Sequence, residues 1–301
     1  MSEYVILIAG GTGFVGRELA AFFSARFPVR VLSRSRNAHV SGCECFYWNP
    51  ETGVYDKNAF KGVTHIINVT GENVSAKPWT PAQQKKILDS RISALETLFV
   101  AVKQHGSCVQ HIISSSAVGF YGSHVSSSVF SEDNAAGTDF LAQVCVAWEQ
   151  QVQRFSSLPI PFTILRLGVV LGKHNGAFKK ITVGLPFKVC VIPGTGKQFV
   201  PWVHVQDVVG IFALCVEKSV YGVFNVVAHD ETDFKTLCKA IQAQKSALLI
   251  RVPAIFLRLV LGKMSHVITR GNRISGHKIT TQGYSYTYTN IYKAVTNLLE
   301  N

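Results

Sequence analysis

The first stretch with a clear hydrophobic pattern is Tyr4–Ala9, where apolar residues follow one another without polar alternation. This pattern predicts a strand buried on both faces, as in a parallel sheet. A glycine-rich turn, Gly10–Gly16, comes next, and Arg17–Phe27 then has the apolar spacing of a helix. Strand, glycine turn and helix in this order indicate a dinucleotide-binding site.

The glycines of this turn have separate expected roles. Gly10 allows the tight turn, Gly13 lets the backbone approach a pyrophosphate, and Gly16 lets the helix pack closely on the strand. The free N–H groups and the dipole at the helix start favour the negative charge of phosphates. The expected cofactor-binding residues of the turn are Gly10, Thr12, Gly13, Phe14, Val15 and Gly16. No Gly-Lys-Ser/Thr follows, which excludes a P-loop.

A second strand is predicted at Pro28–Leu32, and the residues at its end bear on the choice of cofactor. Enzymes that prefer NAD usually carry an Asp or Glu here, which accepts a hydrogen bond from the ribose 2′-hydroxyl. This chain reads Ser33-Arg34-Ser35-Arg36, with no carboxylate before Glu44. Guanidinium and hydroxyl groups suit a 2′-phosphate. We therefore expect NADP (NADPH), bound by Ser33 and Arg34, and the alternative is a basic loop without a ligand.

Further short apolar runs predict a parallel sheet. These runs are Cys43–Trp48, Val63–Val69, Val109–Ile113, Ile160–Leu167 and Tyr221–Val227. Because parallel strands end along one edge of a sheet, we expect Val69, Thr70 and Gly71 to lie beneath the cofactor. We also expect Arg166, at the end of its strand, to bind the cofactor.

Helices are predicted between these strands. Thr80 begins a capping box, with a helix running to about His105. Arg91 lies along this helix and reaches either the cofactor or water. Asp139–Phe155 and Val208–Glu217 also have helical spacing, and we expect Asp207 to cap the second of them.

Composition narrows the function classes. The formal net charge of the 301-residue chain is +12, but its lysines and arginines are scattered, so we expect no nucleic-acid partner. No apolar run is long enough to span a bilayer, and the start lacks the features of a signal peptide. The spacing of Cys43 and Cys45 does not favour a metal site. We expect a cytoplasmic protein, monomeric or homodimeric, with a small-molecule substrate.

Four motifs carry a resemblance to a known family: GGTGFVG near the start, NVTGEN at 68–73, SSSAVGFYG at 114–122 and LRLGVVLG at 165–172. They resemble the extended and atypical short-chain dehydrogenase/reductases, and within these the sugar-nucleotide-epimerase-like proteins with a C-terminal domain of unknown function. The resemblance implies an α/β Rossmann fold, a doubly wound parallel sheet with helices on both faces, and NADP binding. We expect a Rossmann domain over 1–250, with 172–200 contributing to the substrate lobe, and a smaller C-terminal α/β lobe over 251–301.

The chain departs from this family at the catalytic pair. The superfamily uses a Tyr, and a Lys four residues later, to move a proton at the substrate oxygen. Aligning from Ser116 puts Leu141 and Cys145 at these two positions, and neither side chain can do that work. Ser116 remains at the position of the catalytic Ser. Tyr121 is the nearest phenol, and it either replaces the acid or shapes the pocket.

A second departure concerns the substrate. Val200 stands where sugar-nucleotide enzymes of the superfamily carry an Arg that grips a nucleotide phosphate. Two hypotheses remain open. The first is an NADP-dependent oxidoreductase or epimerase-like enzyme acting on an unknown small molecule. The second is a catalytically degenerate NADP-binding sensor or partner-binding module.

Overall fold

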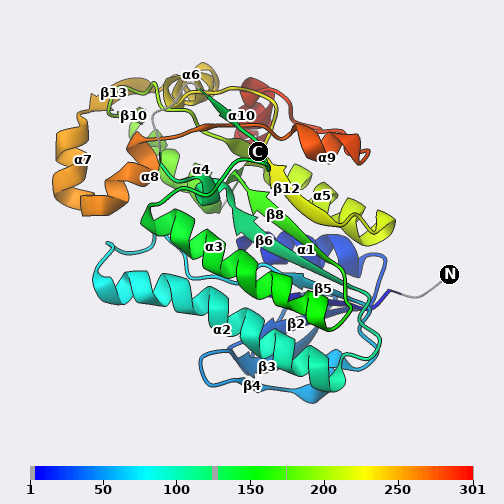
Figure 1. The fold of residues 1–301 in the computed structure, drawn as a ribbon. Helices are drawn as coiled ribbons and strands as arrows, with labels where there is room; N and C mark the ends of the chain where they lie inside the picture. The colour runs from blue at the N-terminus through cyan, green and yellow to red at the C-terminus, as the bar shows by residue number, and fades with distance from the viewer. Residues whose placement is uncertain (1–3, 124–127, 174, 301) are drawn as a thin grey trace.

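The computed structural model describes residues 4–123, 128–173 and 175–300. Its centre is an eight-stranded sheet in the order β12-β8-β6-β5-β1-β2-β3-β4 (Figure 1). The strands are β1 Ile6–Ala9, β2 Val29–Ser33, β3 Glu44–Asn49, β4 Val54–Tyr55, β5 His65–Asn68, β6 His111–Ala117, β8 Phe162–Leu167 and β12 Gly222–Val226. All neighbours pair in parallel except β3 and β4. The chain therefore winds outward from β1 in both directions.

Helices cover both faces of the sheet (Figure 1). One face carries α1 and α5, and the other carries α2 and α3. Their bounds are α1 Phe14–Ser24, α2 Pro81–His105, α3 Phe140–Gln153 and α5 Val205–Lys218. This arrangement confirms the predicted doubly wound Rossmann fold.

The lack of polar alternation in β1 has a direct structural cause. Ile6 and Ile8 pack into the core beneath α1 and α5. Leu7 and Ala9 pack into the opposite core beneath α2 and α3. Both faces of the strand are buried, so both sets of alternating positions must be apolar.

A third hydrophobic core lies in a smaller lobe, in the upper part of Figure 1. It joins residues far apart in the chain, including Phe178, Trp202, Leu237 and Val295. Its elements include β9 Val169–Leu171, α4 Gly176–Ile181, β10 Val189–Pro193, β11 Trp202–His204, α6 Phe234–Lys245, β13 Leu248–Val252 and α10 Ile291–Leu299. The 172–200 segment thus packs against residues that follow position 230 in the sequence. The domain boundary that we expect at residue 250 stays a prediction.

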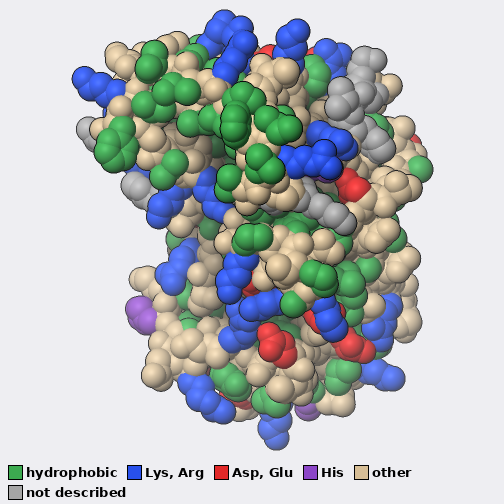
Figure 2. Space-filling view, turned by 90° about the vertical axis from the view of Figure 1, so that its left-hand side faces the viewer, with side chains coloured by type: hydrophobic (Ala, Val, Ile, Leu, Met, Phe, Trp, Pro, Cys, Tyr) green, Lys and Arg blue, Asp and Glu red, His purple; other side chains and the backbone are tan. Residues whose placement is uncertain are grey.

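The connection from β13 to α10 leaves this lobe and returns to the Rossmann domain, where Ile279 enters the core beneath α1 and α5. It contains α7 Ala254–Leu261, the short helical turn η5 Gly262–Ser265, α8 His266–Thr269, β14 Arg273–Ile274 and α9 His277–Thr281. Figure 2 shows exposed apolar side chains gathered over the smaller lobe. Those of α7 are Ile255, Phe256, Leu259 and Val260. No helix among the described residues has the length and hydropathy needed to cross a membrane.

The expected cap at Asp207 is wrong. Helix α5 begins earlier, because the Nδ1 atom of His204 accepts a hydrogen bond from the Gln206 amide and caps the helix there. The Asp207 carboxylate instead accepts hydrogen bonds from the Tyr284 hydroxyl and from the amides of Thr287 and Tyr288. Asp207 therefore fastens the chain before α10 to the Rossmann domain.

Candidate functional site

The glycine turn crosses the carboxyl end of β5. Gly10 has a φ of +86°, and a Cβ atom on it would lie 2.9 Å from the carbonyl carbon and oxygen of Val69. A Cβ on Gly16 would lie 2.1 Å from the Gly10 oxygen. Both positions therefore require glycine, and both keep the turn pressed onto the end of the sheet.

Gly13 differs from these two glycines. Its φ of −77° suits any residue, and a Cβ on it would approach only the Gly10 oxygen, at 3.3 Å. Within the protein, this single tight contact is all that disfavours a side chain here. Gly13 is the N-cap of α1 and gives the helix no side-chain cap, and no acidic residue lies in the first turn. The amides of that turn, with the helix dipole, form a cradle suited to an anion.

The side chains of the turn divide between solvent and the smaller lobe. Thr12 is exposed, and Phe14 and Val15 are half-buried. The Phe14 ring packs against Gly172 and Gly176, where added Cβ atoms would lie 2.3 and 2.8 Å from ring carbons. Phe14 therefore joins the turn to the segment between β9 and α4. The sequence pattern does not predict this contact.

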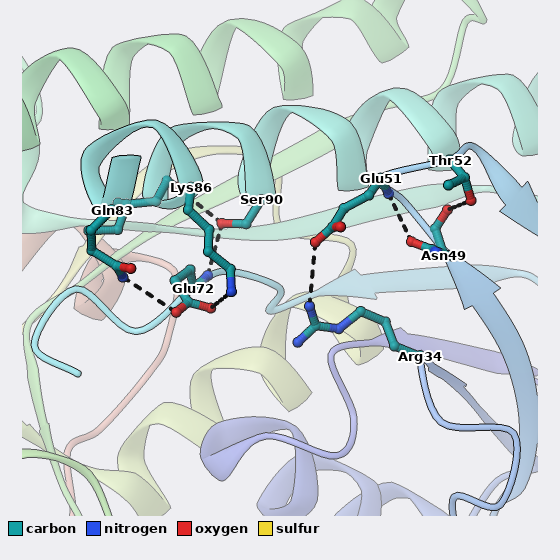
Figure 3. Close-up of polar contacts among 9 residues, drawn as sticks. Arg34, Asn49, Glu51, Thr52, Glu72, Gln83, Lys86 and Ser90 are labelled. Carbon is teal, nitrogen blue, oxygen red and sulfur yellow. Dashed lines mark hydrogen bonds and ion pairs between the residues drawn. The ribbon is translucent and has the colours of Figure 1, made fainter. Parts of the chain in front are cut away.

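The end of β2 presents an accessible cation. The Arg34 guanidinium is about two-thirds exposed, and its Nη1 atom lies 3.8 Å from Oε1 of Glu51 (Figure 3). Ser33 is buried, and its hydroxyl oxygen accepts a hydrogen bond from the Ser35 amide at 3.1 Å. Arg34 is therefore free to face a ligand, whereas the Ser33 hydroxyl stabilises the local turn. Their cofactor roles stay predictions.

The end of β5 is held by Asn68. Its Oδ1 atom accepts hydrogen bonds from the Thr70 amide at 3.2 Å and from the Thr70 hydroxyl at 2.6 Å. Its Nδ2 atom donates to the Ser114 hydroxyl at 3.0 Å. This turn fixes Val69, Thr70 and Gly71 under the glycine turn.

Arg91 reaches this edge from α2 and is held by protein atoms. Its Nη1 atom donates to the carbonyl oxygens of Glu72 and Ile87, and its guanidinium lies 4.8 Å from the Trp148 ring centre. A Cβ on Gly71 would lie 2.9 Å from the guanidinium carbon. Burial lowers the pKa of Arg91. The side chain thus packs against Gly71, and its predicted contact with the cofactor stays a prediction.

The loop after β5 is fastened to the start of α2 by Glu72 (Figure 3). Its amide donates to the Ser90 hydroxyl at 2.9 Å, and its carboxylate accepts from Gln83 at 3.4 Å. Lys86 lies 4.0 Å from the same carboxylate. These contacts hold the first turns of α2 beside the edge where β5 ends.

A buried polar network lies beneath the ends of β6 and β8. The Ser116 hydroxyl donates to Oε1 of Glu149 at 2.7 Å. Arg166 donates to both oxygens of Glu149, at 2.9 and 2.8 Å. It also donates to the Tyr121 hydroxyl at 2.9 Å, and that hydroxyl donates to Oδ1 of Asn225 at 2.8 Å. Every member of the network is satisfied within the protein.

The network changes the interpretation of three predicted residues. Tyr121 is fully buried and its pKa is raised, chiefly by that burial, so its geometry favours shaping the site over supplying a proton. Ser116 is also buried, and its hydroxyl proton is directed to Glu149. Arg166 is directed to Glu149 and Tyr121, with Phe120 stacked on it at 3.4 Å. The predicted roles of all three in catalysis or cofactor binding stay predictions.

Leu141 and Cys145 occupy successive turns of α3 beside this network. A Cβ on Gly119 would lie 3.5 Å from Cβ of Leu141 and 3.7 Å from Sγ of Cys145. Burial raises the pKa of Cys145 to about 12, so its thiol is neutral near pH 7 and cannot replace a lysine cation. Leu141 has no proton to give.

A cavity of about 500 Å³ opens beside Leu141. It lies between the starts of α2 and α3 and the α7–α8 segment. Its lining residues are Trp79, Gln84, Ser123, Asp139, Phe140, Leu141, Arg258, Gly262 and His266. None of them was predicted from the sequence as a functional residue, and Leu141 was singled out only because it stands at the position of the superfamily's Tyr. Arg258 had a recognisable signal, because it is the one charged residue in the apolar run Pro253–Leu261.

Residues 6–226 match the model of the NAD dependent epimerase/dehydratase family. The chain belongs to this family. Residues 252–298 match a second model, which describes a domain of unknown function, DUF1731. These matches confirm the family resemblance that the glycine turn and the later motifs indicated.

Curated relatives align with nearly the whole chain of this epimerase/dehydratase family member. Epimerase family protein YfhF of Bacillus subtilis is 30% identical over 98% of this chain and 97% of its own length. The chloroplastic epimerase family protein SDR39U1 homolog of Arabidopsis thaliana is 27% identical over 99% of this chain and 88% of its own.

Solved structures support the epimerase-type fold. The human epimerase family protein SDR39U1 (isoform 2), solved with NADPH, superposes with a TM-score of 0.88 at 24% identity and covers 99% of both chains. The UDP-glucuronic acid 4-epimerase of Bacillus cereus, solved with UDP-glucuronic acid and NAD, gives a TM-score of 0.79 at 16% identity. It covers 97% of this chain and 96% of its own. Among the described residues, no group of three or more His, Cys, Asp or Glu is arranged to hold a metal ion.

Proposed function

We propose that this protein binds NADPH at the carboxyl edge of its sheet and acts as a reductase-type oxidoreductase on a small molecule. The glycine turn carries the proposal. It lies where the strand order reverses at β1, the position at which doubly wound sheets bind ligands. The exposed glycine at position 13 and the uncapped start of α1 both fit a pyrophosphate.

The preference for NADPH over NADH rests on the end of β2. No carboxylate follows this strand directly, and Arg34 is exposed. Its partner Glu51 is equally exposed, at 66%. Because exposed ion pairs contribute only about 0–1 kcal/mol, a 2′-phosphate can replace Glu51 at little cost. The human relative that was solved with NADPH supports the same choice.

In this proposal each part of the edge has a role in holding the cofactor. The α1 amides bind the pyrophosphate, Arg34 binds the 2′-phosphate, and the Val69–Gly71 turn lies beneath. When bound, NADPH supplies hydride chemistry, and the protein orients it. The cavity beside Leu141 receives the substrate. We extend the proposal to the cytoplasm, because all seven cysteines are unpaired thiols.

A charge-matched pair of variants tests the cofactor assignment. Wild type, Arg34→Ala and Arg26→Ala are titrated with NADPH and with NADH. Arg26 follows the other end of α1 and is ion-paired with Glu217 at 2.8 Å, so it controls for the loss of one positive charge. We expect Arg34→Ala alone to weaken NADPH binding, by about tenfold, and to leave NADH binding unchanged. Equal effects on the two cofactors would contradict the assignment.

A second function is favoured by one observation, the Leu141 and Cys145 pair. A protein without the proton-moving Tyr and Lys, whose Ser116 hydroxyl is directed to Glu149, also fits an NADPH-binding sensor or partner-binding module. The two functions differ in turnover. NADPH oxidation is followed at saturating cofactor over a panel of aldehydes, ketones and 2-oxo acids. Oxidation with any of them supports the oxidoreductase, and saturable binding without oxidation of NADPH supports the sensor.

A further inference from the structure

The cavity beside Leu141 has walls from both family regions. Trp79 and Gln84 come from the start of α2, and Asp139 and Leu141 come from the start of α3. The opposite wall is the α7–α8 segment, within the part that matches the domain of unknown function. A volume of about 500 Å³ is within the range of small-molecule sites.

One end of this cavity is electropositive. Arg258 is exposed, and among the described residues the structure gives it no ion pair or hydrogen-bond partner. His266 lies near enough to Arg258, Arg270 and the Asp139 carboxylate for all three to act electrostatically on it. Helix α2, of 25 residues, begins at this cavity and directs the positive end of its dipole toward it, whereas the start of α3 is capped by the Asp139 carboxylate. Lys and Arg side chains are prominent along the waist between the two lobes in Figure 2.

The carboxylate in the wall is already occupied. Oδ1 of Asp139 accepts a hydrogen bond from the Ala142 amide at 3.0 Å, and Oδ2 accepts one from the Ser123 amide at 2.8 Å. Its charge is therefore offset by the start of the helix that it caps. Arg258 is left as the charged group able to meet a ligand.

The cavity also has an aromatic wall. The rings of Trp79 and Phe140 meet edge to face, with centroids 5.2 Å apart. The Trp79 indole N–H donates to the Val74 carbonyl oxygen at 2.7 Å, which fixes the ring. Leu141 continues this surface at the position where the superfamily has its tyrosine. The exchange replaces a polar group with apolar surface beside the expected reaction position.

We propose that this cavity binds an organic anion, with its carboxylate or phosphate held by Arg258 and a flat apolar body against Trp79, Phe140 and Leu141. The inference rests on the proposed function, because it names the substrate class of the same site. It differs from a nucleotide diphosphate grip, since Val200, at the position of the superfamily's phosphate-binding Arg, is buried and apolar. The C-terminal segment thus supplies the charge that selects the substrate.

Four probes separate charge from shape: 3-phenylpropionate, phenyl phosphate, neutral 3-phenylpropanol, and acetate, which has no apolar body. Each is titrated calorimetrically into wild type, with and without NADPH. We expect 3-phenylpropionate or phenyl phosphate to bind at least about ten times more tightly than 3-phenylpropanol, and we expect acetate to bind most weakly. The tighter of the two anions identifies carboxylate or phosphate as the preferred group.

Arg258→Gln is compared with Arg251→Gln, which removes an exposed arginine of β13 that does not line the cavity. Only Arg258→Gln should abolish the preference for the anion. Equal binding of 3-phenylpropionate and 3-phenylpropanol by wild type, or unchanged binding in Arg258→Gln, would overturn the inference. Titrating NADPH into the same proteins separates the outcomes. NADPH binding without any anion preference removes only the substrate class, whereas absent NADPH binding removes the proposed function.

Discussion

The buried pair of Glu149 and Arg166 makes a sharp prediction about stability. Both side chains are only 5% exposed, and two hydrogen bonds join them in parallel. Glu149→Gln keeps the shape but removes the negative charge, which leaves the Arg166 cation buried without neutralisation. Breaking a buried pair in this way costs about 3–5 kcal/mol. We expect that loss in the free energy of unfolding, measured by urea denaturation.

A control with the same ion-pair distance separates burial from pairing. Arg26 and Glu217 also lie 2.8 Å apart, but their side chains are 44% and 41% exposed. Glu217→Gln should therefore cost only about 0–1 kcal/mol. Replacing both buried charges, as Glu149→Leu with Arg166→Met, should recover part of the loss of Glu149→Gln. Similar losses in Glu149→Gln and Glu217→Gln would refute the reasoning.

Two further predictions concern the tail and the pH dependence. Asp207→Ala removes a buried carboxylate that accepts three hydrogen bonds from partly buried donors around Tyr284, and should lower the unfolding free energy by about 2–4 kcal/mol and speed tryptic cleavage beyond residue 283. Unchanged cleavage would count against the clamp. His65 and His111 are buried, which lowers their pKa values from 6.5 to about 4 and about 3. The unfolded chain then binds protons that the folded chain excludes, so stability should fall as the pH drops from about 6.5 to about 3. His111→Phe should flatten this fall in unfolding curves recorded across that pH range, and an equally steep fall would contradict it.

Local patterns predicted the parts of the site that depend on neighbouring residues. The glycine turn, the end of β5 and the Thr80 cap each follow from a few consecutive residues. The structure explains why, since Gly10 and Gly16 meet backbone within the same turn or directly beneath it. Thr80 accepts a hydrogen bond from the amide of Gln83, three residues later.

Contacts between residues far apart in the chain could not be predicted from local sequence patterns. Tyr121 and Asn225 are 104 positions apart, and no residue near Tyr121 in the sequence indicates that its hydroxyl is buried against Asn225. Glu149 is a charged residue on the apolar side of α3, and this position alone does not identify Arg166 as its partner. Asp207 has the residue type of a cap, but His204 begins the helix earlier and the carboxylate turns to the tail. In each case tertiary packing chose among partners that the local sequence allowed.

The central claim is that the turn at Gly13 holds the cofactor pyrophosphate. Its most direct test is a calorimetric titration of NADPH into wild type and Gly13→Ala, with unfolding curves for both. An alanine at position 13 suits the φ of −77° and makes one tight contact, at 3.3 Å from the Gly10 oxygen, so we expect the unfolding free energy to fall by no more than about 1 kcal/mol. The added methyl group occupies the side left for the pyrophosphate, so NADPH binding should weaken about tenfold or more. Equal affinity in the two proteins, or no binding by wild type, would contradict the claim.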